Sequence, residues 1–386
     1  MGIYKKYLMV ISNDNPTPIL FTIPNFITAG SGRVMFNILT RLDREKFAPY
    51  VCVSRKGGTI EKELAALEIP VLELPFTVPA QPYRTLIQRA RQTALLFREY
   101  QFRIWHSFHY ADDYTEPLIA RFSGARNWIY TKKAMSWGSR AWLLRSYLAR
   151  RIVADNDEMP SLFFDRAGLR SKVRVIHHGL PIERFSPSTP PDLNMREKLG
   201  LSPSTHLITC VAQLVPVKDH PTLLRALAAL PGAHLLLAGS TTDEAYTRQL
   251  NDLARELGVA ERAHFLGSVS NIPALLAESD IFVLPTLGAG RMEGCPVALL
   301  EAMACGKACV ATNIPGSRDL ILPDESGLLV PPSDPAALAA ALQRLIDAPE
   351  LRQRLGHNAR ARVEQHFTIE QEVQAHEALY DELLSR

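Results

Sequence analysis

The length, composition and charge of the chain describe an ordinary globular protein. Its 386 residues are enough for two domains, each with its own core. Hydrophobic residues make up 47% and charged residues 22%, and the net charge of +3 is too small to indicate binding to nucleic acid. No apolar run approaches the ~20 residues that span a bilayer, and no signal-peptide segment opens the sequence. We therefore expect a cytoplasmic protein, and five scattered cysteines fit reduced thiols there.

The first half of the sequence alternates between strand-like and helix-like segments. Buried strands are expected over residues 19–23, 50–53, 71–74, 103–109, 127–131, 151–154 and 172–176. Helices are expected over residues 34–39, 61–67, 83–100 and 137–151. This alternation is typical of a parallel sheet with helices on both faces.

A glycine-containing loop, residues 28–33, follows the first strand and precedes the first helix. Gly30 in such a loop lets backbone N–H groups approach an anion closely. The spacing is not that of a dinucleotide-binding loop, and a tight turn explains the glycines equally well.

Two histidines lie where the fourth strand runs into its loop. His106 and His109 are both candidates for site chemistry, because the carboxyl end of a parallel strand is where ligands bind. Lys132 and Lys133 follow the next strand and are candidates for the acceptor side. The basic, aromatic segment 137–151 is compatible with contact to an anionic membrane, although packing on its own domain with the arginines outward is the favoured interpretation.

The triplet Asp155-Asn156-Asp157 matches a D-x-D pattern that can bind a divalent metal. No second acidic cluster completes an oxygen cage here. We therefore expect no metal at this position.

A proline- and serine-rich break, residues 185–191, separates the halves, and a second run of alternating elements follows. Strands are expected over residues 207–212, 234–239, 263–267, 281–284 and 308–311. Helices are expected over residues 221–230, 296–304, 336–346, 351–365 and 369–384. The fold class expected is α/β, with two doubly wound domains facing a cleft.

The stretch 281–319 carries most of the functional information. It reads as strand, loop, helix and strand, with Pro296 suited to the first helical position and Gly306 to the stop. The helix then starts at the carboxyl end of a strand, where its dipole favours phosphate. Four residues turn a helix by about 400°, so Glu301 lies near Val297 at the edge of the apolar side. A carboxylate there needs a hydrogen-bonding partner.

The segment Glu293 to Glu301 resembles the E-x7-E motif of retaining glycosyltransferases of the GT-B architecture, family 4. Residues 282–285, 301–306 and 316–319 are similar to that family too. The resemblance implies that Glu301 holds the ribose of a sugar nucleotide and that Glu293 lies beside the donor sugar. It implies that one histidine contacts this sugar; the usual H-x-H spacing is absent, and we favour His109 because it lies further into the loop.

The resemblance also assigns the diphosphate site. Residues 213–219 resemble the family's R-L-x-x-x-K-G segment, in which arginine and lysine bind the diphosphate. Lys218 matches, but Gln213 replaces the arginine and brings no charge. Arg291 or Arg33 could compensate. Gly294, Cys295 and Val297 would line the phosphates at the helix start, and Val269 would pair with the base through its backbone.

The function expected from the resemblance is transfer of a sugar, with retention, to an acceptor hydroxyl. A UDP-sugar is expected ahead of a GDP-sugar, with no metal or cofactor and a sugar, lipid-linked or small-molecule acceptor. The acceptor domain should span residues 1–186 with a returning helix 367–386, and the nucleotide domain residues 187–366. Two alternatives are a GT-B-fold sugar-nucleotide epimerase and a non-catalytic binding module.

Overall fold

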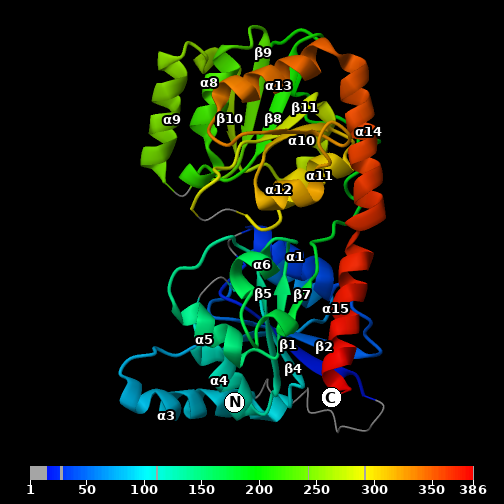
Figure 1. Ribbon diagram of the computed structural model, residues 1–386. Coiled ribbons are helices and arrows are strands. Elements are labelled where there is room, and N and C mark those ends of the chain that lie inside the picture. Colours follow the sequence, from blue (N-terminus) through cyan, green and yellow to red (C-terminus); the bar gives the residue numbers. More distant parts are fainter. Residues whose placement is uncertain (1–14, 27–28, 110–111, 242, 291–292, 386) are drawn as a thin grey trace.

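The computed structural model describes residues 15–26, 29–109, 112–241, 243–290 and 293–385. Arg291, one of the candidate phosphate ligands, lies outside these residues. The chain forms two α/β domains stacked one above the other (Figure 1). Two doubly wound parallel sheets were predicted from the sequence, and both are present.

The first sheet has seven parallel strands in the order β3-β2-β1-β4-β5-β6-β7. Their bounds are β1 Thr17–Ile23, β2 Phe47–Val53, β3 Val71–Glu73, β4 Ile104–Ser107, β5 Asn127–Lys132, β6 Arg151–Ala154 and β7 Val173–Val175. The order reverses between β1 and β4, which makes their carboxyl ends the switch point where such sheets bind ligands.

The helices of this domain are α1 Ala29–Leu39, α2 Thr59–Ala66, α3 Tyr83–Ala94, α4 Thr115–Ser123, α5 Ala141–Leu148 and α6 Met159–Phe164. Two of them differ from expectation. α1 already begins at Ala29, so Gly30 lies in its first turn and not in a loop before it. α5 is shorter than predicted, and the last turns of segment 83–100 form a separate 3-10 helix, Leu95–Tyr100.

The second sheet repeats the strand order with six strands, β10-β9-β8-β11-β12-β13. Their bounds are β8 His206–Val211, β9 Ala233–Ala238, β10 Ala263–Gly267, β11 Ile281–Leu284, β12 Ala308–Thr312 and β13 Leu328–Val330. The strand β11 is an unbroken apolar run because helices cover both faces of the sheet. The carboxyl ends of β8 and β11 form the second switch point.

The helices of the second domain are α7 Met195–Lys198, α8 His220–Ala228, α9 Glu244–Glu256, α10 Ile272–Glu278, α11 Val297–Ala304, α12 Pro315–Leu320, α13 Pro335–Asp347 and α14 Pro349–His366. Pro296 is the N-cap of α11, so the helix begins one residue later than predicted. Gly306 ends the helix with a φ of 68°. Among the described residues, no helix is both long and apolar enough to cross a membrane.

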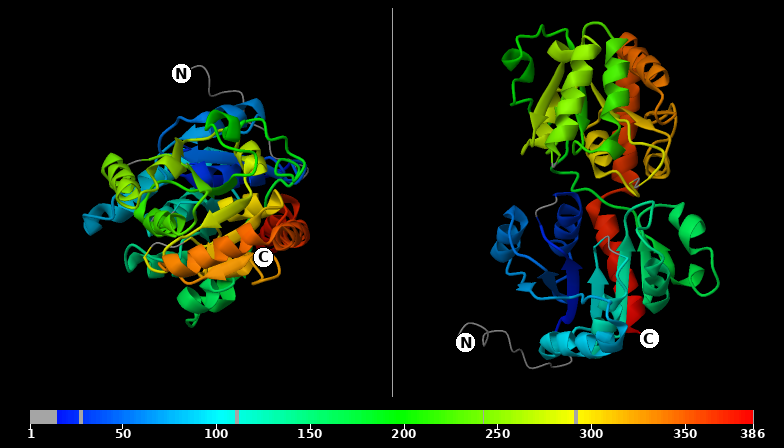
Figure 2. Two further views of the ribbon diagram at one scale, coloured as in Figure 1. Left: turned by 90° about the horizontal axis from the view of Figure 1, so that it is seen from above. Right: turned by 90° about the vertical axis from the view of Figure 1, so that its left-hand side faces the viewer.

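The last helix, α15 Ile369–Leu384, returns to the first domain, as Figures 1 and 2 show. Its apolar face joins the core of the first sheet through Val373, Tyr380 and Leu383. A capping box at Thr368 starts the helix where the chain crosses back. The outgoing and returning crossings are paired: the N–H of Leu180 donates to the carbonyl of Phe367 at 2.9 Å, and that of Ile369 to Leu180 at 3.0 Å.

Candidate functional site

The loops at the carboxyl ends of the two sheets touch each other. Ala134, after β5, forms an antiparallel bridge with Glu293, after β11. The N–H of Gly294 donates to the carbonyl of Lys133 at 2.9 Å, and the Asn156 amide donates to the Gly294 carbonyl at 3.0 Å. The fit is close enough to require glycine, since a Cβ on Gly294 would lie 2.0 Å from an oxygen of Asp155. This junction brings residues of both domains to one place.

Glu301 is a carboxylate without a hydrogen-bonding partner among the residues that the structure describes. It lies on α11 and is only partly exposed. Burial raises its pKa from 4.5 to about 7, and the positive charge of Arg184 offsets part of this rise. A partly buried carboxylate of this kind can accept hydrogen bonds from ligand hydroxyls.

Lys218 and Glu293 form an ion pair. The Lys218 Nζ lies 2.5 Å from Glu293 Oε1, and their side chains are 13% and 32% exposed. The segment after β8 and the loop after β11 are also joined directly, because Leu287 N–H donates to the Val217 carbonyl at 2.9 Å. Lys218 is therefore already neutralised by Glu293. An anionic ligand would have to displace this carboxylate or share the lysine with it.

Asp219 occupies the position where the resembled family has glycine. Its φ of 47° and ψ of 44° are left-handed, a conformation that aspartate tolerates better than most residues. The side chain also caps α8, because its Oδ1 accepts from the Thr222 N–H at 3.4 Å, and its Oδ2 accepts from the Thr222 hydroxyl at 2.8 Å. The substitution of glycine is thus compatible with the turn that places Lys218.

The remaining donor-side candidates are spread around this centre. Gln213 is exposed directly after β8. Val269 is partly buried against a small apolar cluster beside β9. Cys295 is buried, and burial raises the pKa of its thiol. Arg33 is occupied by a bidentate pair with Glu63 at 2.6 and 2.9 Å, which makes it a poor replacement for the missing arginine.

The two candidate histidines have different environments. His106 is fully buried in β4, with Nδ1 2.8 Å from the Tyr380 hydroxyl and Nε2 2.8 Å from Thr131 Oγ1. Nδ1 thus joins the sheet to α15 and Nε2 joins β4 to β5, and His106 is not among the residues that line the cavity described next. His109 does line it, with Nε2 2.7 Å from Glu116 Oε2.

A cavity of about 560 Å³ lies in the first domain beside the interdomain junction. Its walls include His109, Lys132, Lys133, Ala134 and Trp137. Lys132 Nζ donates to the Ser136 carbonyl at 2.6 Å and lies 3.9 Å from the centre of the Trp137 ring. Lys133 donates to the Phe108 carbonyl, and burial lowers its pKa to about 7. Because Ala134 also pairs with Glu293, the cavity adjoins the donor-side residues.

The Asp155-Asn156-Asp157 triplet joins the domains. Asp155 is buried beneath Gly294, whereas Asp157 is exposed and its N–H donates to Asp319 Oδ2 at 2.8 Å. The two aspartates of the triplet thus face different surroundings. Asp157, His177 and Asp319 each offer one atom within 4.8 Å of the others, and these three could hold a metal ion.

Sequence reasoning missed Glu116 and Arg145. Glu116 is fully buried on α4, and Arg145, expected to point outward from its helix, is 1% exposed and lies 3.5 Å from Glu116. A signal was available: Glu116 precedes Ile119 and Ala120 by three and four residues, which places a carboxylate on the apolar side of its helix. Glu301 was singled out by this pattern, and it applied equally to Glu116.

Comparison with known proteins finds two family models that together cover most of the chain. The model described as glycosyl transferases group 1 matches residues 192–362. The model described as glycosyltransferase family 4 matches residues 28–184. Each match corresponds closely to one of the two sheets.

Individual relatives are similar over part of their length. A lipopolysaccharide core biosynthesis mannosyltransferase, LpcC, from Rhizobium leguminosarum bv. viciae is 30% identical over 69% of this chain and 72% of its own. A GDP-mannose-dependent monoacylated alpha-(1-6)-phosphatidylinositol monomannoside mannosyltransferase from Corynebacterium glutamicum is 36% identical over 50% of this chain. The chain spans only 51% of that relative's length.

Among solved structures, a glycosyltransferase from Rickettsia africae ESF-5 superposes with a TM-score of 0.84. The sequences are 21% identical, and the superposition covers 96% of this chain and 99% of the other. This likeness shows the fold of the whole chain.

Proposed function

The chain belongs to the GT-B glycosyltransferases of group 1, family 4, and on this premise we propose that it transfers a sugar from a nucleotide diphosphate sugar to an acceptor hydroxyl. GDP-mannose is the donor we favour. The Corynebacterium relative is named as GDP-mannose-dependent, and the Rhizobium relative is a mannosyltransferase. This reverses the order expected from the sequence, in which UDP came before GDP.

The observation that carries the proposal is the environment of the Glu301 carboxylate. It has no hydrogen-bonding partner among the described residues, and burial raises its pKa. The two hydroxyls of a ribose would supply the missing donors. When the donor binds, the ionised carboxylate would gain two charge-assisted hydrogen bonds, each worth about 1.5–3 kcal/mol.

Lys218 and the start of α11 would bind the diphosphate. The backbone N–H groups of Leu299 and Leu300 already donate to the Pro296 carbonyl, so Val297 is the better amide donor for a phosphate oxygen. Glu293, which now neutralises Lys218, would turn to the donor sugar as the diphosphate takes the lysine. Gln213 would contribute a hydrogen bond without charge.

The acceptor would occupy the cavity that His109, Lys132 and Lys133 line. Ala134 lines this cavity and pairs with Glu293, so an acceptor hydroxyl there would lie close to the anomeric carbon of the donor. Both relatives named above are described as acting in glycolipid or lipopolysaccharide synthesis, so we propose an acceptor of that class. Leu144, Tyr147 and Leu148 on α5 are 41–47% exposed and would let the acceptor domain rest on a membrane surface.

The chemistry proposed is transfer with retention from the front face of the sugar. The barrier is departure of the diphosphate with oxocarbenium character at the sugar, which Lys218 and the α11 amides would lower by stabilising the leaving charge. Burial between the domains would exclude water from this step. We propose that neither a metal nor a cofactor takes part.

The test compares donors and follows the product. Calorimetry with GDP-mannose, UDP-glucose and ADP-glucose should rank GDP-mannose first, and Glu301→Ala should weaken binding of that donor at least tenfold. Proton NMR of the product from an α-linked donor should show an α-linkage. Equal affinity of wild type and Glu301→Ala, or a β-linked product, would contradict the assigned ribose contact or the retention respectively.

A further inference from the structure

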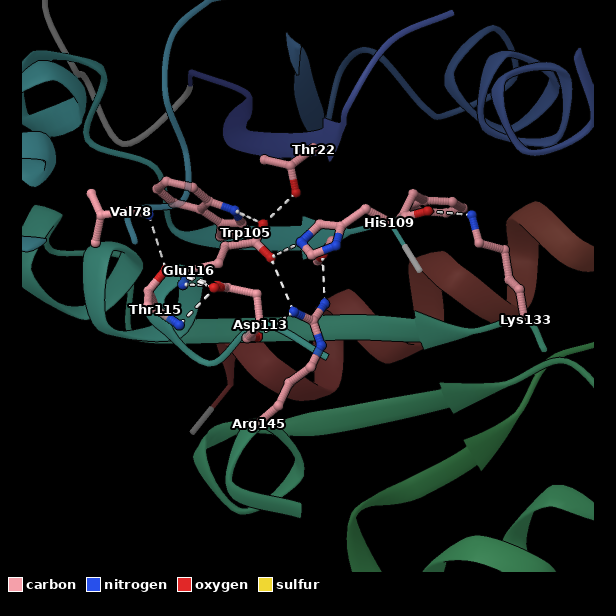
Figure 3. A network of polar contacts seen from close by, with 11 residues as sticks. Thr22, Val78, Trp105, His109, Asp113, Thr115, Glu116, Lys133 and Arg145 are labelled. Carbon is pink, nitrogen blue, oxygen red and sulfur yellow. Dashed lines mark hydrogen bonds and ion pairs between the residues drawn. The ribbon is translucent and has the colours of Figure 1, made fainter. Parts of the chain in front are cut away.

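The first domain contains a buried carboxylate with four side-chain partners, which come from β1, β4, the loop after β4 and α5 (Figure 3). Glu116, in the first turn of α4, is fully buried. Thr22 of β1 and Trp105 of β4 donate to one of its oxygens, at 2.5 and 2.9 Å. His109 contacts the other oxygen at 2.7 Å, and Arg145 of α5 lies 3.5 Å from it.

This carboxylate is ionised over the whole range in which the protein would work. Burial by itself would raise the pKa of Glu116, but the charge and hydrogen bond of His109, the charge of Arg145 and the Thr22 hydrogen bond outweigh it. The pKa is lowered to about 2. An ionised carboxylate can only accept hydrogen bonds, so its partners must all be donors.

The consequence for His109 is a fixed tautomer. Its Nε2 must carry the proton that the Glu116 oxygen accepts, and the Nδ1 of the neutral ring is then a hydrogen-bond acceptor. The ring is also held in place by packing, because the Phe76 ring lies 5.7 Å away at 36°. Glu116 itself cannot move to follow the ring, since its other oxygen is bonded to β1 and β4.

Neutralising the charge of Glu116 does not require His109. Arg145 donates to the Asp113 carbonyl at 2.7 Å and to Ser107 Oγ at 2.8 Å. It could neutralise Glu116 with no histidine present. What the histidine adds is a contact from this buried group to the wall of the cavity, which His109 shares with Lys133 and Ala134.

We propose that Glu116 is a positioning residue for sugar transfer: it holds His109 in the Nε2-protonated tautomer, so that Nδ1 accepts a hydrogen bond from a hydroxyl of the bound sugar or acceptor. The inference rests on the proposed function, because it needs a sugar beside His109. Removing the partners that orient a metal-ligating histidine typically costs 10–100-fold in affinity or activity, and we expect a loss of the same order here.

The test is a double-mutant cycle on kcat. Glu116→Gln keeps the size of the side chain but removes its charge, and it should lower kcat about 30-fold with little change in the donor KM. His109→Gln alone should lower kcat by at least as much. Adding Glu116→Gln to His109→Gln should then change kcat less than twofold, because the group through which Glu116 acts is gone. Equal losses in both backgrounds would overturn the inference and leave Glu116 a structural residue.

Thr22→Val is the matched control. It removes one hydrogen bond to the other oxygen of Glu116 and conserves the volume of a fully buried side chain. If burial of the network alone mattered, this variant and Glu116→Gln would lower kcat alike. We expect Thr22→Val to retain kcat within about threefold while lowering the melting temperature.

A second readout does not depend on turnover. Nitrogen-15 NMR of histidine-labelled protein should show His109 in the Nε2-protonated form in the wild type and a mixture of tautomers in Glu116→Gln. An unchanged tautomer would overturn the inference even if kcat fell. If the wild type transfers no sugar from any nucleotide donor, the proposed function fails, and the NMR result alone then decides whether Glu116 controls His109.

Discussion

The two domains share one strand order but carry charge at their switch points in different ways. In the second domain, Lys218, Glu293 and Glu301 are partly exposed, and Glu301 has no hydrogen-bonding partner among the described residues. In the first domain, Glu116, Arg145 and His109 are all at most 4% exposed, and Glu116 pairs with both of the others. On the proposed function, the second domain would gain hydrogen bonds when the donor binds, whereas the polar groups of the first domain are already paired within the protein.

The largest effect should come from the glycine where the two domains meet. Gly294→Ala would place a methyl group 2.0 Å from Asp155 Oδ1 and 2.6 Å from Met159, so the loop must shift and the interdomain bonds break. We expect a loss of about 3 kcal/mol in unfolding free energy and no measurable turnover. Urea denaturation and a transfer assay measure the two effects.

Gly30→Ala is its control, because a Cβ there meets nothing within 4 Å and alanine favours a helix. Adding Asp155→Ala to Gly294→Ala should restore part of the lost stability. No restoration would mean that the clash with Asp155 is not the cause.

The next prediction concerns the positive charge of Lys218. Lys218→Met keeps the length of the side chain but removes its charge, so the departing diphosphate loses its stabilisation. We expect kcat to fall about 100-fold. Steady-state kinetics with saturating donor measures this, and Lys198→Met, at an exposed position of α7, should have no effect. A change in KM alone would assign Lys218 to ground-state binding.

A smaller effect concerns pH and Glu301. Since burial raises its pKa to about 7, the carboxylate is protonated at lower pH and ionised only above that value. Donor affinity should therefore rise several-fold between pH 6 and pH 8, because ribose hydroxyls bind the ionised form better. Stability without ligand should fall over the window from 4.5 to about 7, since the unfolded state binds fewer protons there.

Calorimetry and thermal unfolding at several pH values measure both trends. Glu301→Gln should flatten both curves. If the variant shows the same pH dependence as the wild type, another group is responsible.

The smallest expected effect is an increase in donor affinity. Gln213→Arg would return the second cation that the family usually places after this strand. The position is exposed, so the new side chain can be accommodated, and we expect donor affinity to rise about threefold to tenfold. Gln213→Lys separates charge from geometry, because it adds the charge without the planar fork. Unchanged affinity in both variants would indicate that the position does not face the diphosphate.

The sequence predicted the second domain better than the first for a physical reason. Around Glu301, strand, loop, helix and stop follow one another within forty residues, so local patterns contain the geometry. In the first domain the site is assembled from β1, β4, α4 and α5, which local patterns do not relate to each other. His109 could therefore be favoured over His106 only by position in its loop, and the burial of Arg145 was not foreseen.

Junction residues were the hardest to interpret. No metal was expected at the Asp155-Asn156-Asp157 triplet, and its contact with Gly294 could not be predicted because that contact depends on how the two domains meet. Asp219 stands where the family has glycine, and its left-handed backbone and its capping bond explain why it is tolerated.

The two crossings between the domains run side by side and are hydrogen-bonded to each other at Leu180, Phe367 and Ile369. A Cβ on the neighbouring Gly179 would lie 2.2 Å from the Thr368 carbonyl, so the two crossings are in direct backbone contact. Because the two crossings are bonded to each other at this point, the two domains share a single hinge. Opening and closing would then follow an arc about that hinge, and the distance between Glu301 and His109 would change through one angle.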